Sequence, residues 1–212
     1  MTKPTLYFVT DVEIDGPNVG LNSMLSFASV CVDAQGQVRG DFETVLQPLP
    51  DRTADPDTMA WWATHPLAWA AATQNAMDPG AEMNRFADWV DSFDQRCVFA
   101  SRPLLLDGMW IDAYLRRFTD TRIFDGPFEG RKIFQGAGLD IPSYLMGVLG
   151  LCERVSTYVR MPPHWLGHHP HTHRAIDDAR GYDNLLWLLF SVAGDRAATA
   201  QAKQEFLDAN SQ

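Results

Sequence analysis

The sequence predicts an α/β or α+β fold in which helices are layered on a mixed sheet. Three strand-like segments with short connections open the chain, and strands joined so closely are expected to pair antiparallel. Helical segments interleaved with short strand-like ones follow, an order typical of a mixed sheet covered by helices. The chain has 212 residues, 46% hydrophobic and 21% charged, which suits a single domain over residues 1–212 with a core at about 5–193.

The three opening strands are predicted from residue type and alternation. Residues 5–13 are rich in β-branched and aromatic side chains, which favour extended structure. Turn-forming residues fill positions 15–23, and a second strand is expected at 24–32. A hairpin turn at 33–36 then leads into an alternating segment at 38–47, the third strand.

The remainder is predicted to be mainly helical, because apolar residues recur with the helical period. Two short helices are separated at His65-Pro66, since proline disfavours helical structure in the residue before it. A short apolar strand is expected at 97–101. The predicted helices are 57–64, 67–73, 81–93, 108–118, 141–149, 174–192, which has the strongest pattern, and a C-terminal helix at about 196–208.

Composition limits the partners and the location to expect. The net charge of −10 argues against extended binding of duplex nucleic acid but leaves open the binding of a few nucleotides at one end. Cys31, Cys97 and Cys152 form no disulfide or metal-binding pattern and suit a reducing compartment. Residues 1–4 lack a secretory signal pattern, and no apolar run is long enough to cross a bilayer. A cytoplasmic protein without membrane contact is therefore expected.

Two carboxylates end the first strand, and their spacing predicts part of a metal site. Asp11 and Glu13 stand at positions i and i+2, which places both side chains on one face of a strand. Their mutual repulsion would favour a proton on one of them. A divalent cation removes this conflict, and Mg²⁺ and Mn²⁺ prefer carboxylate oxygen. The alternative is a solvated strand end, where acidic residues are common.

Further candidate site residues stand near the starts of predicted helices. Asp107 precedes the helix at 108–118, where its carboxylate either faces the strand ends or caps the helix. His173 and Asp178 are five residues apart, about 500° around a helix, so they cannot share a helical face. We therefore expect Asp178 on the second helical turn and His173 in the loop before it, mobile enough to act as a general base. The neighbouring Asp177 is the alternative for the acidic position.

A histidine-rich segment before this helix raises the alternative of a zinc site. The segment has no paired cysteines, and its spacing fits neither a helix nor a strand. Only His173 stands five residues before an aspartate, whereas His171 stands five residues before Ile176. His173 is therefore the preferred site residue. The histidines of this segment are His164, His168, His169, His171 and His173.

The acidic motifs of the chain stand in a definite order. They are Asp11-x-Glu13, Asp107 and His173-x₄-Asp178. This order and spacing resemble the DEDDh group of 3′–5′ exonucleases, within the ribonuclease H-like superfamily, over about residues 5–190. The related DEDDy pattern has a tyrosine four residues before the last aspartate, where this chain has Arg174. Four segments also resemble a bacterial branch of exoribonuclease-like proteins. They are Asp11–Pro17, Met59–Trp62, Leu106–Trp110 and Leu139–Ser143.

The resemblance implies a fold, a reaction and a cofactor. The fold is an α/β, ribonuclease H-like mixed sheet, with three antiparallel strands followed by parallel strands, flanked by α-helices. The reaction is metal-dependent removal of nucleoside 5′-monophosphates from the 3′ end of single-stranded RNA or DNA, with RNA or short oligonucleotides favoured. His173 would take a proton from the attacking water. Family members often form homodimers, so a homodimer is one alternative for an oligomeric state that the sequence leaves open. Two divalent cations, Mg²⁺ or Mn²⁺, would bind Asp11, Glu13, Asp107 and Asp178.

Candidate substrate contacts are less closely defined. Met24 lies where relatives contact the terminal base, and Trp62, with Trp61, offers either a stacking surface for bases or a core side chain. Arg174 is a candidate for phosphate binding, with a solvated helix face as the alternative. Many members carry threonine where this chain has Ile14, so the nucleotide pocket is expected to differ. Two other functions stay open: a metal phosphohydrolase of small nucleotides or phosphodiesters, and a catalytically silent nucleic-acid-binding domain.

Overall fold

The computed structural model describes residues 4–151, 160–169 and 171–210. Its strands are β1 (Thr5–Ile14), β2 (Met24–Asp33), β3 (Val38–Val45), β4 (Arg96–Ser101) and β5 (Leu139–Asp140). They form one sheet in the order β3-β2-β1-β4-β5. β2 pairs antiparallel with both β1 and β3, and β4 pairs parallel with both β1 and β5. The predicted mixed sheet, three antiparallel strands followed by parallel ones, is confirmed.

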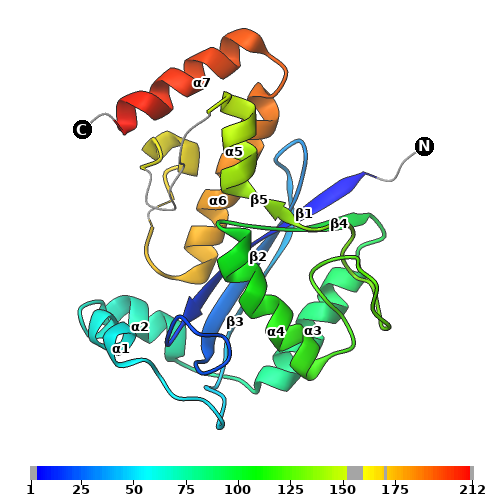
Figure 1. The fold of residues 1–212 in the computed structure, drawn as a ribbon, viewed down its shortest axis with the longest axis vertical. Helices are drawn as coiled ribbons and strands as arrows, with labels where there is room; N and C mark the ends of the chain where they lie inside the picture. Colours follow the sequence, from blue (N-terminus) through cyan, green and yellow to red (C-terminus); the bar gives the residue numbers. More distant parts are fainter. Residues whose placement is uncertain (1–3, 152–159, 170, 211–212) are drawn as a thin grey trace.

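Helices cover both faces of this sheet (Figure 1). They are α1 (Pro56–Ala63), α2 (Pro66–Thr73), α3 (Pro79–Asp91), α4 (Met109–Phe118), α5 (Ile141–Leu149), α6 (Ala175–Val192) and α7 (Arg196–Ala209). α3 and α4 pack on one face, while α5 and α6 pack on the other and carry α7. α1 and α2 lie together near the carboxyl end of β1.

Local capping signals set the helix boundaries close to their predicted positions. Asp55, Asp78 and Asp140 each accept a hydrogen bond from the backbone N–H three residues later, and each is followed by a proline in the first turn. Such residues satisfy the unpaired N–H groups at a helix start. α6 begins at Ala175, one residue later than predicted, because Arg174 occupies its N-cap position in extended conformation.

The two faces of the sheet are packed with different kinds of side chain. On the α3–α4 face the Phe8 ring centroid lies 5.2 Å from that of Trp89 and 5.5 Å from that of Phe134, both edge to face. On the α6 face, Ala28 of β2 packs with Ala175, Ile176 and Ala179 of the first turns of α6, two of which are alanines. Small side chains at a contact shorten the distance between packed elements. The start of α6 is therefore held close to the centre of the sheet.

Two of the three cysteines lie in the described part of the chain. Cys31 and Cys97 are buried free thiols that pack in the hydrophobic core as small apolar residues. Cys152 falls outside the described residues. Among the helices described, none has both the length and the apolar character needed to cross a membrane.

Candidate active site

Three carboxylates from two elements meet between β1 and α6. Alternate β1 side chains point to opposite faces, so Asp11 and Glu13 share the α6 face, while Phe8 and Val12 pack in the α3–α4 core. Asp178, on the first turns of α6, lies opposite them. One carboxylate oxygen from each of the three residues lies within 4.8 Å of the other two, and all three side chains are buried. The predicted Asp11, Glu13 and Asp178 are thus brought together.

The backbone around Glu13 departs from regular pairing. The register of β1 against β2 shifts between Glu13 and Ile14. A bulge of this kind re-aims the side chains next to it and is common beside active sites. The indole N–H of Trp62 donates to the Ile14 carbonyl oxygen at 2.9 Å, which ties α1 to this irregular segment.

Asp107 lies in a single π-helical turn, η1 (Leu104–Gly108), at the start of α4. Its carboxylate is buried and accepts hydrogen bonds from the backbone N–H groups of Arg102 and Val12. It does not cap α4, whose N-cap residue is Gly108. Within the described residues its Oδ2 atom has no hydrogen-bond partner. A carboxylate oxygen that binds a cation is expected, in the absence of the ion, to be buried beside other carboxylates without a hydrogen-bond partner. Asp107 Oδ2 fits this description.

Burial raises the pKa values of Asp11, Glu13 and Asp107, and repulsion between carboxylates raises those of Asp11 and Glu13 further. Burial is the largest cause for Asp11, whose pKa is raised well above its usual range, and the carboxylates of Asp107, Glu13 and Asp178 add to it. The pKa of Glu13 is raised for the same reasons, burial first. Burial also raises the pKa of Asp107 to about 8. An oxygen-only set of crowded acids, with one oxygen unsatisfied, fits a hard divalent cation.

Sequence reasoning missed two residues near these acids. The Arg102 guanidinium lowers the pKa values of Asp11 and Asp107, and its carbon lies 5.2 Å from the centroid of the Tyr182 ring. The Asp11 and Asp178 carboxylates, after burial, help to raise the pKa of Tyr182. The sequence contained an indication of each position. Arg102 directly follows β4, the neighbour of β1, and Tyr182 stands one helical turn after Asp178, on the same face of α6.

His173 precedes α6 in a left-handed conformation, with φ of 56°. Its ring stands edge-on to the Trp61 ring, with centroids 4.8 Å apart. Burial is the main cause that lowers the His173 pKa; His171 and His65 lower it further, and the Asp178 carboxylate opposes them. The histidine that contacts Asp178 directly is His171, whose Nδ1 lies 2.9 Å from Asp178 Oδ2. The five-residue offset does not separate His171 from His173, because residues 171–174 precede the helix.

Comparison with known proteins identifies solved structures that share the fold of this chain. No protein-family model matches the sequence, and no curated protein matches it. Among solved structures, exonuclease I superimposes with a TM-score of 0.65 at 13% identity, covering 93% of this chain and 43% of its own length. The nuclease domain of 3′hExo, described as a DEDDh family member bound to rAMP, gives 0.64 at 10% identity, covering 89% of this chain and 92% of that domain.

The chain has the fold of the DEDDh exonucleases. A zinc-bound complex of E. coli exonuclease I with single-stranded DNA is also similar, with a TM-score of 0.62 at 14% identity over 92% of this chain. This chain spans less than half the length of exonuclease I.

On this exonuclease fold, two predicted substrate contacts lie in the protein interior. Met24 is fully buried in the α3–α4 core, and the Trp62 ring is buried against Trp69. Met24 therefore offers no surface to a nucleotide base, and Trp62 offers only an edge that lines a pocket with Met59 and Trp69. Trp61 is the exposed member of the pair, at 38%, and stacks on His65 with centroids 4.2 Å apart.

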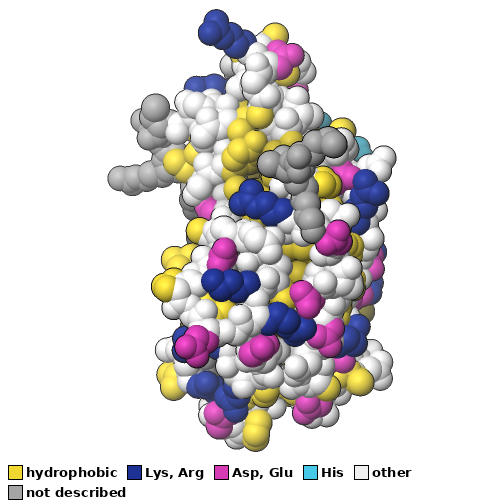
Figure 2. Space-filling model, turned by 90° about the vertical axis from the view of Figure 1, so that its right-hand side faces the viewer, with side chains coloured by type: hydrophobic (Ala, Val, Ile, Leu, Met, Phe, Trp, Pro, Cys, Tyr) yellow, Lys and Arg dark blue, Asp and Glu magenta, His cyan; other side chains and the backbone are white. Residues whose placement is uncertain are grey.

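The arginine predicted to meet phosphate groups is engaged in an ion pair, as is Arg117. Arg174 is bidentate to Glu43 of β3, at 2.8 and 2.9 Å, and is therefore directed away from the carboxylates. Arg117 pairs in the same way with Asp51. Figure 2 shows basic and acidic side chains interspersed on one face of the molecule. Other arginine–acid pairs are Arg39–Asp33, Arg85–Glu82, Arg122–Asp112, Arg131–Asp88 and Arg180–Asp41.

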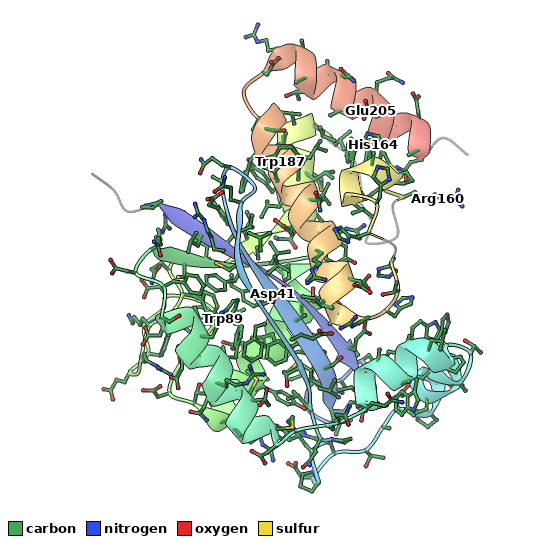
Figure 3. All side chains as sticks on the ribbon, turned by 180° about the vertical axis from the view of Figure 1, so that it is seen from behind. Asp41, Trp89, Arg160, His164, Trp187 and Glu205 are labelled. Atoms are coloured by element: carbon green, nitrogen blue, oxygen red, sulfur yellow. The ribbon has the colours of Figure 1, made fainter. Side chains whose placement is uncertain are left out.

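His164 lies apart from the carboxylates. It belongs to a short 3₁₀ turn, η2 (Pro163–Leu166), and its Nε2 lies 3.1 Å from Glu205 of α7 (Figure 3). The same Glu205 carboxylate accepts the indole N–H of Trp165 at 3.0 Å. This histidine therefore helps to attach α7, and the histidines of the segment do not act as one group.

Proposed function

We propose that this protein is a metal-dependent 3′–5′ exonuclease that removes nucleoside 5′-monophosphates from single-stranded RNA or DNA, with RNA or short oligonucleotides favoured. One observation carries the proposal: oxygens of Asp11, Glu13 and Asp178 lie within 4.8 Å of one another on a fold shared with exonucleases. A fold alone does not define a reaction, so the acidic cluster is the decisive part.

The four acids are the proposed ligands of two divalent cations, Mg²⁺ or Mn²⁺. Asp11 and Glu13 would be fixed by the central strand, Asp107 by the η1 turn and Asp178 by α6. Bound cations would lower the pKa of water and stabilise charge on the phosphate and the departing 3′ oxygen. Supports on three different elements would preorganise the site, which is most of what phosphoryl transfer requires.

His173 is the proposed general base. Its lowered pKa keeps the imidazole neutral near pH 7, the form that accepts a proton from the attacking water. The loop position before α6 leaves the ring free to adjust, while Trp61 limits its contact with solvent. Asp178 would orient His171 at the edge of the same site.

Short substrates and a reducing location are part of the proposal. The net charge of −10 and the ion-paired arginines leave little positive surface along which a long strand would bind. The buried free thiols Cys31 and Cys97 suit the cytoplasm. We also propose a homodimer, for which Leu67 and Leu105, 87% and 80% exposed, are the most accessible large apolar side chains described. Light scattering at several protein concentrations tests this state.

The activity is tested with 5′-labelled single-stranded RNA and DNA oligomers, each with Mg²⁺, Mn²⁺ or EDTA. We expect a metal-dependent ladder that shortens from the 3′ end and disappears in Asp178→Ala. Asp177→Asn is the matched control, because the Asp177 carboxylate accepts the Thr172 hydroxyl at 2.9 Å instead of facing the cluster, and asparagine keeps an acceptor for that bond. Absence of cleavage of either polymer in every metal would contradict the proposal and favour hydrolysis of small phosphodiesters or silent binding.

A further inference from the structure

A second group of metal-binding side chains adjoins the carboxylates and contains nitrogen donors. One donor atom each from His171, His173 and Asp178 lies within 4.8 Å of the other two. His171 Nδ1 is 2.9 Å from Asp178 Oδ2, and the two imidazole centroids are 4.3 Å apart. Asp178 also belongs to the oxygen-only group with Asp11 and Glu13. The two groups therefore share one ligand.

The residue between the two histidines attaches this segment to α6. The backbone N–H of Thr172 donates to Asp178 Oδ1 at 3.2 Å, and its hydroxyl lies 2.9 Å from Asp177 Oδ2. These bonds fix one oxygen of Asp178 and leave the other toward His171. The flanking imidazoles are thereby held on the same side of the helix start. The two imidazoles are therefore held in place by the hydrogen bonds of Thr172, and their proximity is not an accident of two exposed side chains.

The donor set selects a different cation from the one proposed for catalysis. Imidazole nitrogen suits zinc and related transition metals, whereas Mg²⁺ prefers an all-oxygen environment. Two histidines and one carboxylate are a ligand set of zinc enzymes, in which a fourth position is open. Zinc–nitrogen bonds of about 2.0–2.1 Å bring ligand atoms to roughly 3.3 Å from each other. His171 Nδ1 and Asp178 Oδ2, 2.9 Å apart, are already within that separation, and the His171 side chain is half-exposed.

We propose that His171, His173 and Asp178 bind Zn²⁺, or another cation that prefers nitrogen, and that this binding switches off the exonuclease site. Zinc held there would occupy His173 and withdraw Asp178 from the catalytic cations. The binding follows from the side chains alone, and the inhibition rests on the proposed function. His171 and His173, together with Asp178, would thus act as a sensor of excess transition metal.

Binding is tested by titrating the metal-free protein with Co²⁺, a spectroscopic probe of zinc sites. We expect visible absorption of the intensity typical of nitrogen ligands in a site with fewer than six donors, removed by added Zn²⁺. His171→Ala should lower the affinity at least about tenfold, the smallest effect seen even for outer partners of a metal site. His168→Ala is the matched control, since His168 is exposed and outside the group. Equal affinities in wild type and His171→Ala would overturn the site.

Inhibition is tested by adding Zn²⁺ to Mn²⁺-supported cleavage, with each variant compared with its own zinc-free rate. We expect zinc to inhibit the wild type and the His168→Ala control alike, and His171→Ala to require about tenfold more zinc. Equal sensitivity of all three, or cleavage supported by zinc itself, would overturn the regulatory role. A protein that cleaves nothing in Mg²⁺ or Mn²⁺ would contradict the exonuclease proposal, and the cobalt spectra would still decide the zinc site.

Discussion

Trp62 donates its indole N–H to the carbonyl oxygen of Ile14, 2.9 Å away, and so joins α1 to the residue that follows Glu13. We expect Trp62→Phe to lower the free energy of unfolding by about 1–2 kcal/mol, because phenylalanine keeps much of the packing but leaves the carbonyl without its partner. Urea denaturation measures the change. Trp61→Phe is the control, and this more exposed ring should change stability by no more than about 0.5 kcal/mol. Equal effects of the two would contradict the role given to this bond.

The stability of the metal-free protein should fall as pH rises from about 4 to about 8. Asp107 has a folded pKa of about 8 against an ordinary value of 3.8, so between these values the folded state holds a proton that the unfolded state has lost. That contribution is fully present below pH 4 and is lost as pH rises through 8, at up to about 1.4 kcal/mol per pH unit for each proton. Denaturation in EDTA at pH 6, 7 and 8 measures the slope.

Two variants separate the acids that produce this slope. Asp107→Asn should make the free energy of unfolding depend less on pH over the whole range up to pH 8. Asp183→Asn should weaken this dependence only below pH 7, because burial raises the pKa of Asp183 to about 7. A slope in Asp107→Asn identical to that of the wild type would show that this carboxyl is ionised in the metal-free protein.

Close packing of α6 on β2 should control metal affinity. Ala28→Leu inserts a larger side chain between β2 and Ala179, which costs about 1–3 kcal/mol and moves Asp178 away from Asp11. We expect the rise in melting temperature caused by Mn²⁺ to shrink in this variant. Ala87→Leu is the matched control, since Ala87 is equally buried but lies on α3 at the other face. That variant should lose stability and keep the full Mn²⁺ response; the reverse pattern would refute the argument.

Trp61 should set the pH range of the proposed activity through His173. Replacing Trp61 by alanine exposes the imidazole, so its lowered pKa should rise toward the usual value of 6.5. Because the base works in its neutral form, the acid limb of the kcat/KM profile should move to higher pH. The ratio of rates at pH 6 and pH 8 would then fall relative to the wild type. An unshifted acid limb with a uniformly reduced rate would assign Trp61 to substrate binding alone.

Local patterns in the sequence predicted most of the fold and the placement of three acids, which are Asp11, Glu13 and Asp178. The period of two in β1 is enough to place Asp11 and Glu13 on one face, and capping residues fix most helix starts within one or two residues. The strands and their antiparallel order followed from short connections. These features depend on neighbours in sequence, which is the information that a single chain provides.

Features that depend on distant segments were not accessible in this way. Trp61 and Trp62 are adjacent, and only the docking of α1 on Ile14 decides which ring is buried. Arg174 meets Glu43, which is 131 residues away in sequence, so its partner is set by the closure of α6 on β3. His171 reaches Asp178 because the chain turns through a left-handed residue before the helix. None of these contacts follows from residue type or spacing.

The arginine–carboxylate pairs along β3 and α6 have a consequence for affinity. Arg174 and Arg180 are held by Glu43 and Asp41, so neither is available to neutralise a phosphate without breaking an existing pair. A single-stranded nucleic acid that enters the carboxylate site would release few of the counterions condensed on its phosphates. Its binding constant should then depend only weakly on salt concentration, and additional nucleotides behind the 3′ end should strengthen binding little. Such an enzyme would bind the 3′ terminus of a nucleic acid with an affinity that depends little on the length of the nucleic acid.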